Sequence, residues 1–151
     1  MGLLSRLFGT TAARDLLADL AEDYRAEAEQ AAQLRADADR ARYPQAADAL
    51  RRLAQMEERH ATWLRDHIVN LGGDVPALVP PEVRGKNQWE RAVGALRDAQ
   101  AKRRRLIEQV AHWDPDEPDV VELLHRIEQE DLREQTVYEA LIMRSDPQSI
   151  D

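Results

Sequence analysis

The chain has 151 residues, of which 21 are basic and 29 are acidic, and its formal net charge is −8. This length and an apolar content of 43% fit one folded domain, while the absence of cysteine excludes disulfides, thiolate metal sites and cysteine nucleophiles. The negative charge disfavours binding to nucleic acid, and no apolar run is long enough to span a bilayer, so we expect a cytoplasmic protein. Alanine, leucine, glutamate and arginine dominate the composition, which favours helices and excludes an α/β enzyme or a β-sandwich.

Residues 1–10 precede the first predicted helix as an N-terminal extension. Its large apolar side chains are Leu3, Leu4, Leu7 and Phe8. The segment is too short for a secretory signal and lacks a cleavage site. We expect this extension to be a frayed end or a strip packed on the bundle, in preference to an anchor on a membrane surface.

Chain breakers divide the next residues, 11–144, into four helices, and residues 145–151 follow as a C-terminal tail. The predicted helices cover residues 11–42, 44–71, 86–113 and 118–144. Pro44 is tolerated in the first turn of the second helix, and the Gly72-Gly73 pair ends that helix. Residues 74–85 contain three prolines and are predicted to be a connection.

The lengths of the connections predict the topology. The links between the first two helices and between the last two are only a few residues long, so each pair is an antiparallel hairpin. The second helix should be roughly 40 Å long, and the roughly 14 residues after it can reach about 46 Å when extended. This segment can therefore cross the whole bundle, which predicts an all-α four-helix bundle with one long crossover.

Each predicted helix carries an inward stripe that is apolar at both ends and polar near its middle. On the second helix the polar part contains Glu57 and His60, a Glu-x-x-His pair whose side chains share one face. The polar positions predicted on the other stripes are Glu27, then Gln100 and Arg103, then Glu128 and Asp131. Carboxylates and imidazoles are ligands for iron and manganese, so the polar layer is a candidate metal site.

Three segments resemble a known family. Residues 60–73 are similar to the second helix of bacterioferritins, and Tyr43 matches the aromatic residue at the turn before that helix in bacterioferritins and rubrerythrins. Residues 127–132 resemble the second Glu-x-x-His segment of the same family. The resemblance covers residues 15–142 and implies a ferritin-like bundle, in which one glutamate from each of two helices and a Glu-x-x-His pair from each of the other two hold two irons.

Carried over residue by residue, this ligand set is incomplete. Glu57 and His60 match it fully, and Glu128 matches the second bridging glutamate, but Asp131 stands where histidine is expected. The predicted metal ligands are Glu27, Glu57, His60, Glu128 and Asp131, with iron or manganese as the metal.

The other two expected glutamates are absent at the matching positions. The glutamate of the first helix falls on Tyr24, and Glu27 follows one turn later. The glutamate of the third helix falls on Ala99 or Gln100, and Arg103 is the next inward residue.

Two functions remain open from the sequence. In the first, a degenerate di-metal site binds iron or manganese for oxidation or peroxide chemistry, and whether the chain is an enzyme is left open. In the second, a metal-free ferritin-like module forms a homodimer or binds a partner protein, and its polar layer is a salt-bridge network around Arg103. An inward Arg103 favours the network, whereas an outward Arg103 leaves room for a metal.

Overall fold

The structure is a computed structural model that describes the backbone of residues 3–151 and the side chains of residues 15–151. Its helices are α1 (Leu3–Asp39), α2 (Pro44–Asn70), α3 (Gln88–Trp113) and α4 (Pro118–Arg144), and no strand occurs among the residues described. The predicted all-α class is confirmed. None of these helices combines the length and the apolar character that crossing a membrane requires.

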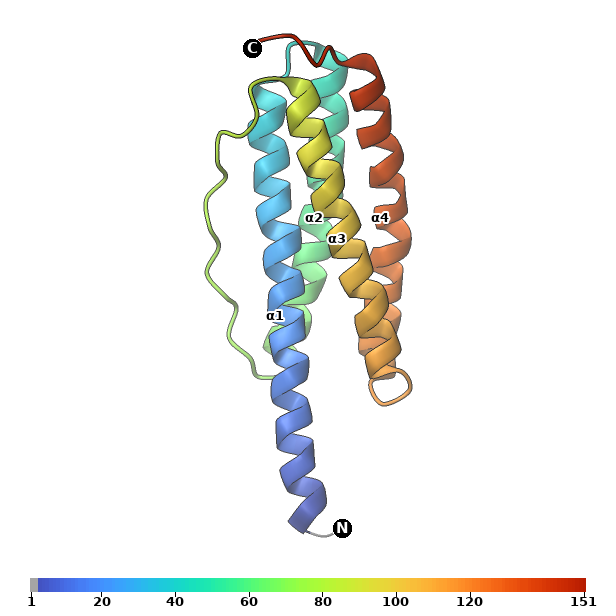
Figure 1. Ribbon diagram of the computed structural model, residues 1–151. Helices are drawn as coiled ribbons and strands as arrows, with labels where there is room; N and C mark the ends of the chain where they lie inside the picture. The colour runs from blue at the N-terminus through green and yellow to red at the C-terminus, as the bar shows by residue number, and fades with distance from the viewer. Residues whose placement is uncertain (1–2) are drawn as a thin grey trace.

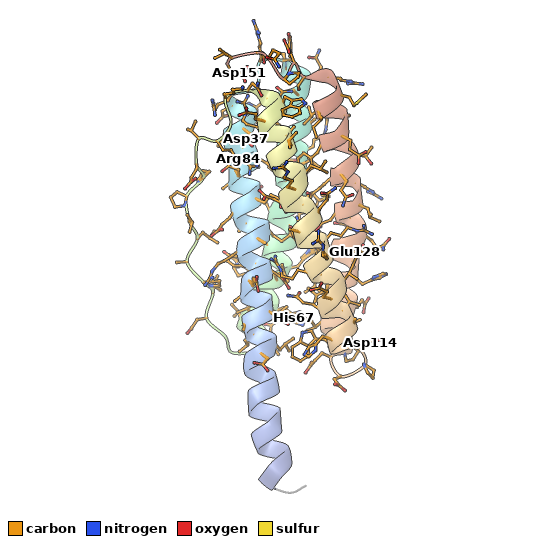
Figure 2. All side chains as sticks on the ribbon, in the orientation of Figure 1. Asp37, His67, Arg84, Asp114, Glu128 and Asp151 are labelled. Carbon is orange, nitrogen blue, oxygen red and sulfur yellow. The ribbon has the colours of Figure 1, made fainter. Side chains whose placement is uncertain are left out.

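The four helices form two antiparallel hairpins, α1 with α2 and α3 with α4, which pack side by side (Figure 1). Residues 71–87 return along the outside of the bundle, so α3 begins at the same end as α2 and runs parallel to it. Arg84 fastens this crossover, since its guanidinium lies 3.5 Å from Asp37 of α1 and 2.8 Å from Asp98 of α3 (Figure 2). The predicted single long crossover is confirmed.

Helix α1 begins at Leu3, earlier than the predicted start at residue 11. Its first turns continue beyond the ends of the other helices (Figure 1). The expectations for this extension concern the side chains of Leu3, Leu4, Leu7 and Phe8, which lie outside the described residues.

Local sequence explains where the other helices begin and end. Asn87 caps α3, since its side chain accepts the backbone N–H of Glu90 at 2.8 Å. Pro118 occupies the first turn of α4, where its missing N–H leaves no hydrogen bond unmade. Gly72 follows α2 with a φ of 79°, a left-handed conformation that favours glycine and stops the helix.

The apolar core consists of two clusters on either side of a polar layer. One cluster includes Leu34, Leu53 and Tyr138, and the other includes Leu20, Leu64 and Leu124. Buried charged side chains lie between them on all four helices. The buried faces of the helices therefore show the predicted pattern, which is apolar at both ends and polar in the middle.

The predicted inward face of α3 was wrong by one residue. The inward positions of this helix are Ala92, Ala95, Ala99, Lys102, Leu106, Gln109 and Trp113. A shift of one residue turns a helix by about 100°, so Gln100 and Arg103 leave the centre. The alanines let α3 pack closely against its neighbours. The bulkier Ile107, one turn after Arg103 on the face predicted to be buried, is 47% exposed.

Candidate metal centre

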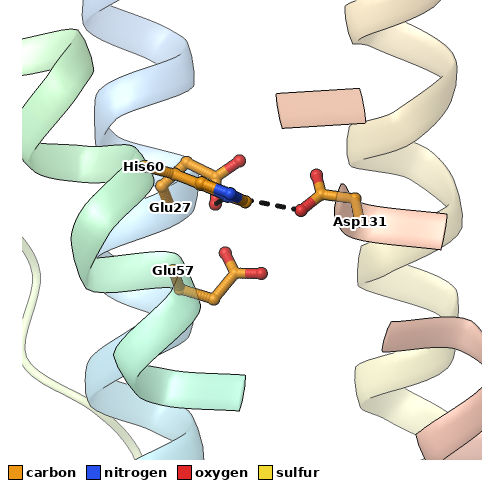
Figure 3. A group of neighbouring side chains, drawn as sticks. All are labelled: Glu27, Glu57, His60 and Asp131. Atoms are coloured by element: carbon orange, nitrogen blue, oxygen red, sulfur yellow. Dashed lines mark hydrogen bonds and ion pairs between the residues drawn. The ribbon is translucent and has the colours of Figure 1, made fainter. Parts of the chain in front are cut away.

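The polar layer brings together four of the five predicted ligands, which we call the central cluster (Figure 3). The central cluster consists of Glu27, Glu57, His60 and Asp131. One ligand atom from each residue lies within 4.8 Å of those from the other three, and none of the side chains is more than 2% exposed. Three carboxylates and one imidazole suit a divalent iron or manganese ion.

Glu128, the fifth predicted ligand, lies away from the central cluster. It sits between α3 and α4 (Figure 2), where its Oε1 accepts a hydrogen bond from Nε of Arg103 at 2.8 Å. The Arg103 side chain is 32% exposed, so this pair lies at the edge of the bundle. On α4 the pair that faces the centre is Asp131 with Glu134, one turn beyond the predicted pair.

Lys102 of α3 is the cation that the sequence analysis missed. Its Nζ lies 2.7 and 2.8 Å from the two carboxylate oxygens of Glu57. Further carboxylates surround it, Glu27 at 3.3 Å and Asp131 and Glu134 each at 3.4 Å. The signal that could have found Lys102 is its spacing of three residues from Ala99 and four from Leu106, which places all three on one helix face.

His60 connects the central cluster to Glu130, a second residue that the sequence analysis missed. Its Nδ1 lies 3.4 Å from Oε2 of Glu27 and 3.4 Å from Oδ1 of Asp131. On the other side of the ring, Nε2 lies 2.5 Å from Oε2 of Glu130. Histidines that bind metals usually donate their second N–H to a carboxylate in this way.

Burial disfavours the charged forms of the titratable groups in the cluster, and the charges of neighbouring groups then determine the direction in which each pKa is shifted. Burial disfavours a charged His60, yet the contacts with Asp131 and Glu27 raise its pKa to about 10. Burial alone would raise the pKa of Glu27, but the ammonium of Lys102 and the imidazole of His60 lower it. The pKa values of Asp131 and Glu134 are raised, in both cases by burial and by the charge of Glu27.

The cluster contains more acceptors than its donors can satisfy. Oε1 of Glu27 is buried without a hydrogen-bond partner, and the two oxygens of Asp131 have only ion-pair contacts of 3.4 Å, one to His60 and one to Lys102. Leaving a buried polar group unsatisfied costs about 1–3 kcal/mol. An additional cation would provide these oxygens with a partner.

No protein-family model and no curated protein matches the sequence. Among solved structures, a mycobacterial bacterioferritin matches with a TM-score of 0.76 and 20% identity, over 83% of this chain and 81% of that one. An open-pore ferritin from the hyperthermophilic archaeon Archaeoglobus fulgidus matches with a TM-score of 0.74 and 17% identity, over 86% of this chain and 83% of that one. The chain has the ferritin-like fold.

The ligand set of ferritin-like di-metal proteins fits one half of this bundle and not the other. The hairpin of α1 and α2 supplies the ligand types of one half, a carboxylate from one helix and a Glu-x-x-His pair from the other. The carboxylate is Glu27, one turn after the matching position at Tyr24, and the pair is Glu57 and His60. The hairpin of α3 and α4 places Lys102 where the set has a glutamate, and an ammonium cannot bind a metal. The donors present therefore fit one divalent ion, held by the central cluster.

A surface pocket of about 360 Å³ between α1 and α3 reaches Lys102. Gln30 lines this pocket and donates hydrogen bonds to Glu134 at 3.5 Å and to the Tyr138 hydroxyl at 3.2 Å. Glu29 and Asp98 place two carboxylates on its wall. Two arginines, Arg84 and Arg105, line the same pocket, so its wall carries charges of both signs beside the buried cluster.

Asp23, one turn before Glu27 on α1, is a separate buried acid. It is 1% exposed, and its Oδ1 accepts a hydrogen bond from Nε of Arg105 at 3.2 Å. Burial outweighs this ion pair and raises the pKa of Asp23 to about 7.

Asp23 should make the stability of the protein fall as pH rises. The folded protein holds this proton up to about pH 7, whereas the unfolded chain releases it near the ordinary value of 3.8. Between these values the wild type should lose up to about 1.4 kcal/mol of stability per pH unit relative to Asp23→Asn. Urea denaturation of both proteins from pH 4 to 8 measures the difference. The exposed Asp15→Asn serves as control, and a constant difference between Asp23→Asn and wild type would contradict the prediction.

Proposed function

We propose that this chain is a ferritin-like protein that binds one divalent cation, iron or manganese, in the central cluster. The observation that carries this proposal is the set of four buried ligand atoms within 4.8 Å of one another, drawn from three helices. The unpartnered Oε1 of Glu27 supports it, and so do the long ion-pair contacts of Asp131, because a buried carboxylate oxygen normally accepts a full hydrogen bond.

The residues around the ion would have distinct tasks. The carboxylates of Glu27, Glu57 and Asp131 would neutralise it, and Nδ1 of His60 would complete the donor set. Glu130 would hold the His60 ring by accepting its Nε2–H. His60 must lose its Nδ1 proton to act as a ligand, so loading the site should release protons. Iron or manganese in such a site would supply oxidation or peroxide chemistry.

Lys102 favours the alternative function, a metal-free module. Its ammonium contacts carboxylates from α1, α2 and α4, and such pairing is what a buried ionic network needs. In this alternative the bundle would serve as a homodimerisation or partner-binding unit. A cytoplasmic location fits either function, since a chain without cysteine suits a reducing compartment.

Metal loading distinguishes the two functions. The purified chain is loaded anaerobically with Fe(II) or Mn(II), desalted and measured by elemental analysis. We expect one ion per chain in the wild type and none in Glu57→Gln, because Glu57 is fully buried at the centre of the donor set. Glu58→Gln is the matched control, since Glu58 is half-exposed and paired with Arg35. A wild type without retained metal would contradict the proposal and favour the metal-free module.

A further inference from the structure

The two hairpins contribute matching triplets to the polar layer. The hairpin of α1 and α2 contributes Glu27, Glu57 and His60, and the hairpin of α3 and α4 contributes Lys102, Asp131 and Glu134. Glu57 follows Glu27 by 30 residues, and Asp131 follows Lys102 by 29. In both triplets the third member comes three residues after the second. Lys102 therefore holds the position on α3 that Glu27 holds on α1.

We propose that the ammonium of Lys102 takes the place of a second divalent cation, so that the cluster accommodates one metal ion and one organic cation. This inference rests on the proposed function for its first ion. The partners of Lys102 support it. The ammonium contacts Asp131 and Glu134 of its own half, and its shortest contacts are to Glu57 of the other half. A second metal ion would need these same carboxylates.

Charge balance agrees with one ion beside the ammonium. Four carboxylates face the centre, and they are Glu27, Glu57, Asp131 and Glu134. When all four are ionised, a divalent ion together with Lys102 offsets three of their charges. His60, which is protonated in the metal-free protein, then loses its Nδ1 proton to act as a ligand. A second divalent ion would instead be repelled by an ammonium that is 3% exposed, in a region where charge repulsion is strong.

The test is the metal content of Lys102 variants. Lys102→Glu replaces the ammonium on α3 by a carboxylate, the group that its counterpart Glu27 provides on α1. We therefore expect two ions per chain in this variant, against one in the wild type. Lys102→Met removes the cation without adding a ligand, so we expect one retained ion with an affinity at least tenfold higher. Elemental analysis counts the ions after loading with Mn(II). The electron paramagnetic resonance spectrum then separates isolated Mn(II) from spin-coupled pairs.

The outcomes separate this inference from the proposed function. One ion in the wild type and one in Lys102→Glu would overturn the inference and leave the proposed function intact. No ion in the wild type but retained ions in Lys102→Glu would overturn the proposed function and the count of one metal ion beside Lys102. It would still show that the ammonium of Lys102 takes the place of metal in the cluster. Circular dichroism establishes that each variant is folded. If Lys102→Glu does not fold, an unchanged Mn(II) affinity of Lys102→Met would by itself overturn the inference.

Discussion

Lys102→Met is expected to lower the free energy of unfolding of the metal-free protein by about 3–5 kcal/mol, the usual cost of removing one partner from a buried ion pair. The side chain is 3% exposed, and its ammonium holds both oxygens of Glu57 at 2.7 and 2.8 Å. Methionine fills a similar volume but leaves Glu57 and the other carboxylates around Lys102 without their cation. Urea denaturation in the presence of a chelator measures the loss.

The only other lysine in the chain provides a matched control for this measurement. Lys86 is 59% exposed and pairs with Glu90 at 3.5 Å, so Lys86→Met should change the stability by no more than about 0.5 kcal/mol. Adding Mn(II) should restore part of the stability of Lys102→Met, because an ion that binds only the folded state stabilises it. A loss below about 1 kcal/mol without metal would mean that the carboxylates take up protons instead of depending on the ammonium.

The fold could be predicted because its determinants are local. Pro44, Gly72 and the prolines of residues 74–85 interrupt the helical pattern, and the lengths between them decide which helices are antiparallel. The start of α1 was less predictable. The segment before residue 11 contains no proline, and Gly9 weakens a helix without ending it, so the sequence does not mark where the helix begins.

The site was only partly predictable because it depends on how each helix is rotated about its axis. On α2, large apolar residues such as Leu53 and Leu64 flank Glu57 and His60 at helical spacing, so one rotation is clearly favoured. On α3, two possible stripes lie one residue apart. One carries alanines and Lys102, and the other carries bulkier residues and Arg103. Only packing against the neighbouring helices selects the alanine stripe.

The rotation of α4 about its axis could not be predicted from the sequence either. Its acidic residues at 128, 130, 131 and 134 cover more than one face, so spacing alone allows either of two inward pairs. The structure directs Asp131 and Glu134 inward and leaves Glu128 to pair with Arg103. The matching bacterioferritin and ferritin are only 20% and 17% identical to this chain. Similarity at that level indicates the scaffold, while the chemistry of the centre depends on individual residues such as Lys102.

Glu130→Gln is expected to weaken Mn(II) binding by about 10- to 100-fold without removing any residue of the central cluster. The carboxylate of Glu130 lies 2.5 Å from Nε2 of His60. It therefore keeps a proton on that nitrogen, so that Nδ1 is the nitrogen that would lose its proton and bind an ion. Glutamine keeps the shape of the side chain but removes the charge that fixes this tautomer and makes the imidazole a stronger ligand.

Titration with Mn(II), followed by electron paramagnetic resonance of the free ion, measures this change in affinity. Glu139→Gln is the matched control, because it makes the same substitution at an exposed position of the same helix and should leave the affinity unchanged. Equal weakening in both variants would mean that the net charge of α4 attracts the ion. Weakening confined to Glu130→Gln would show that His60 binds through Nδ1 and that its orientation by Glu130 determines the affinity of the site.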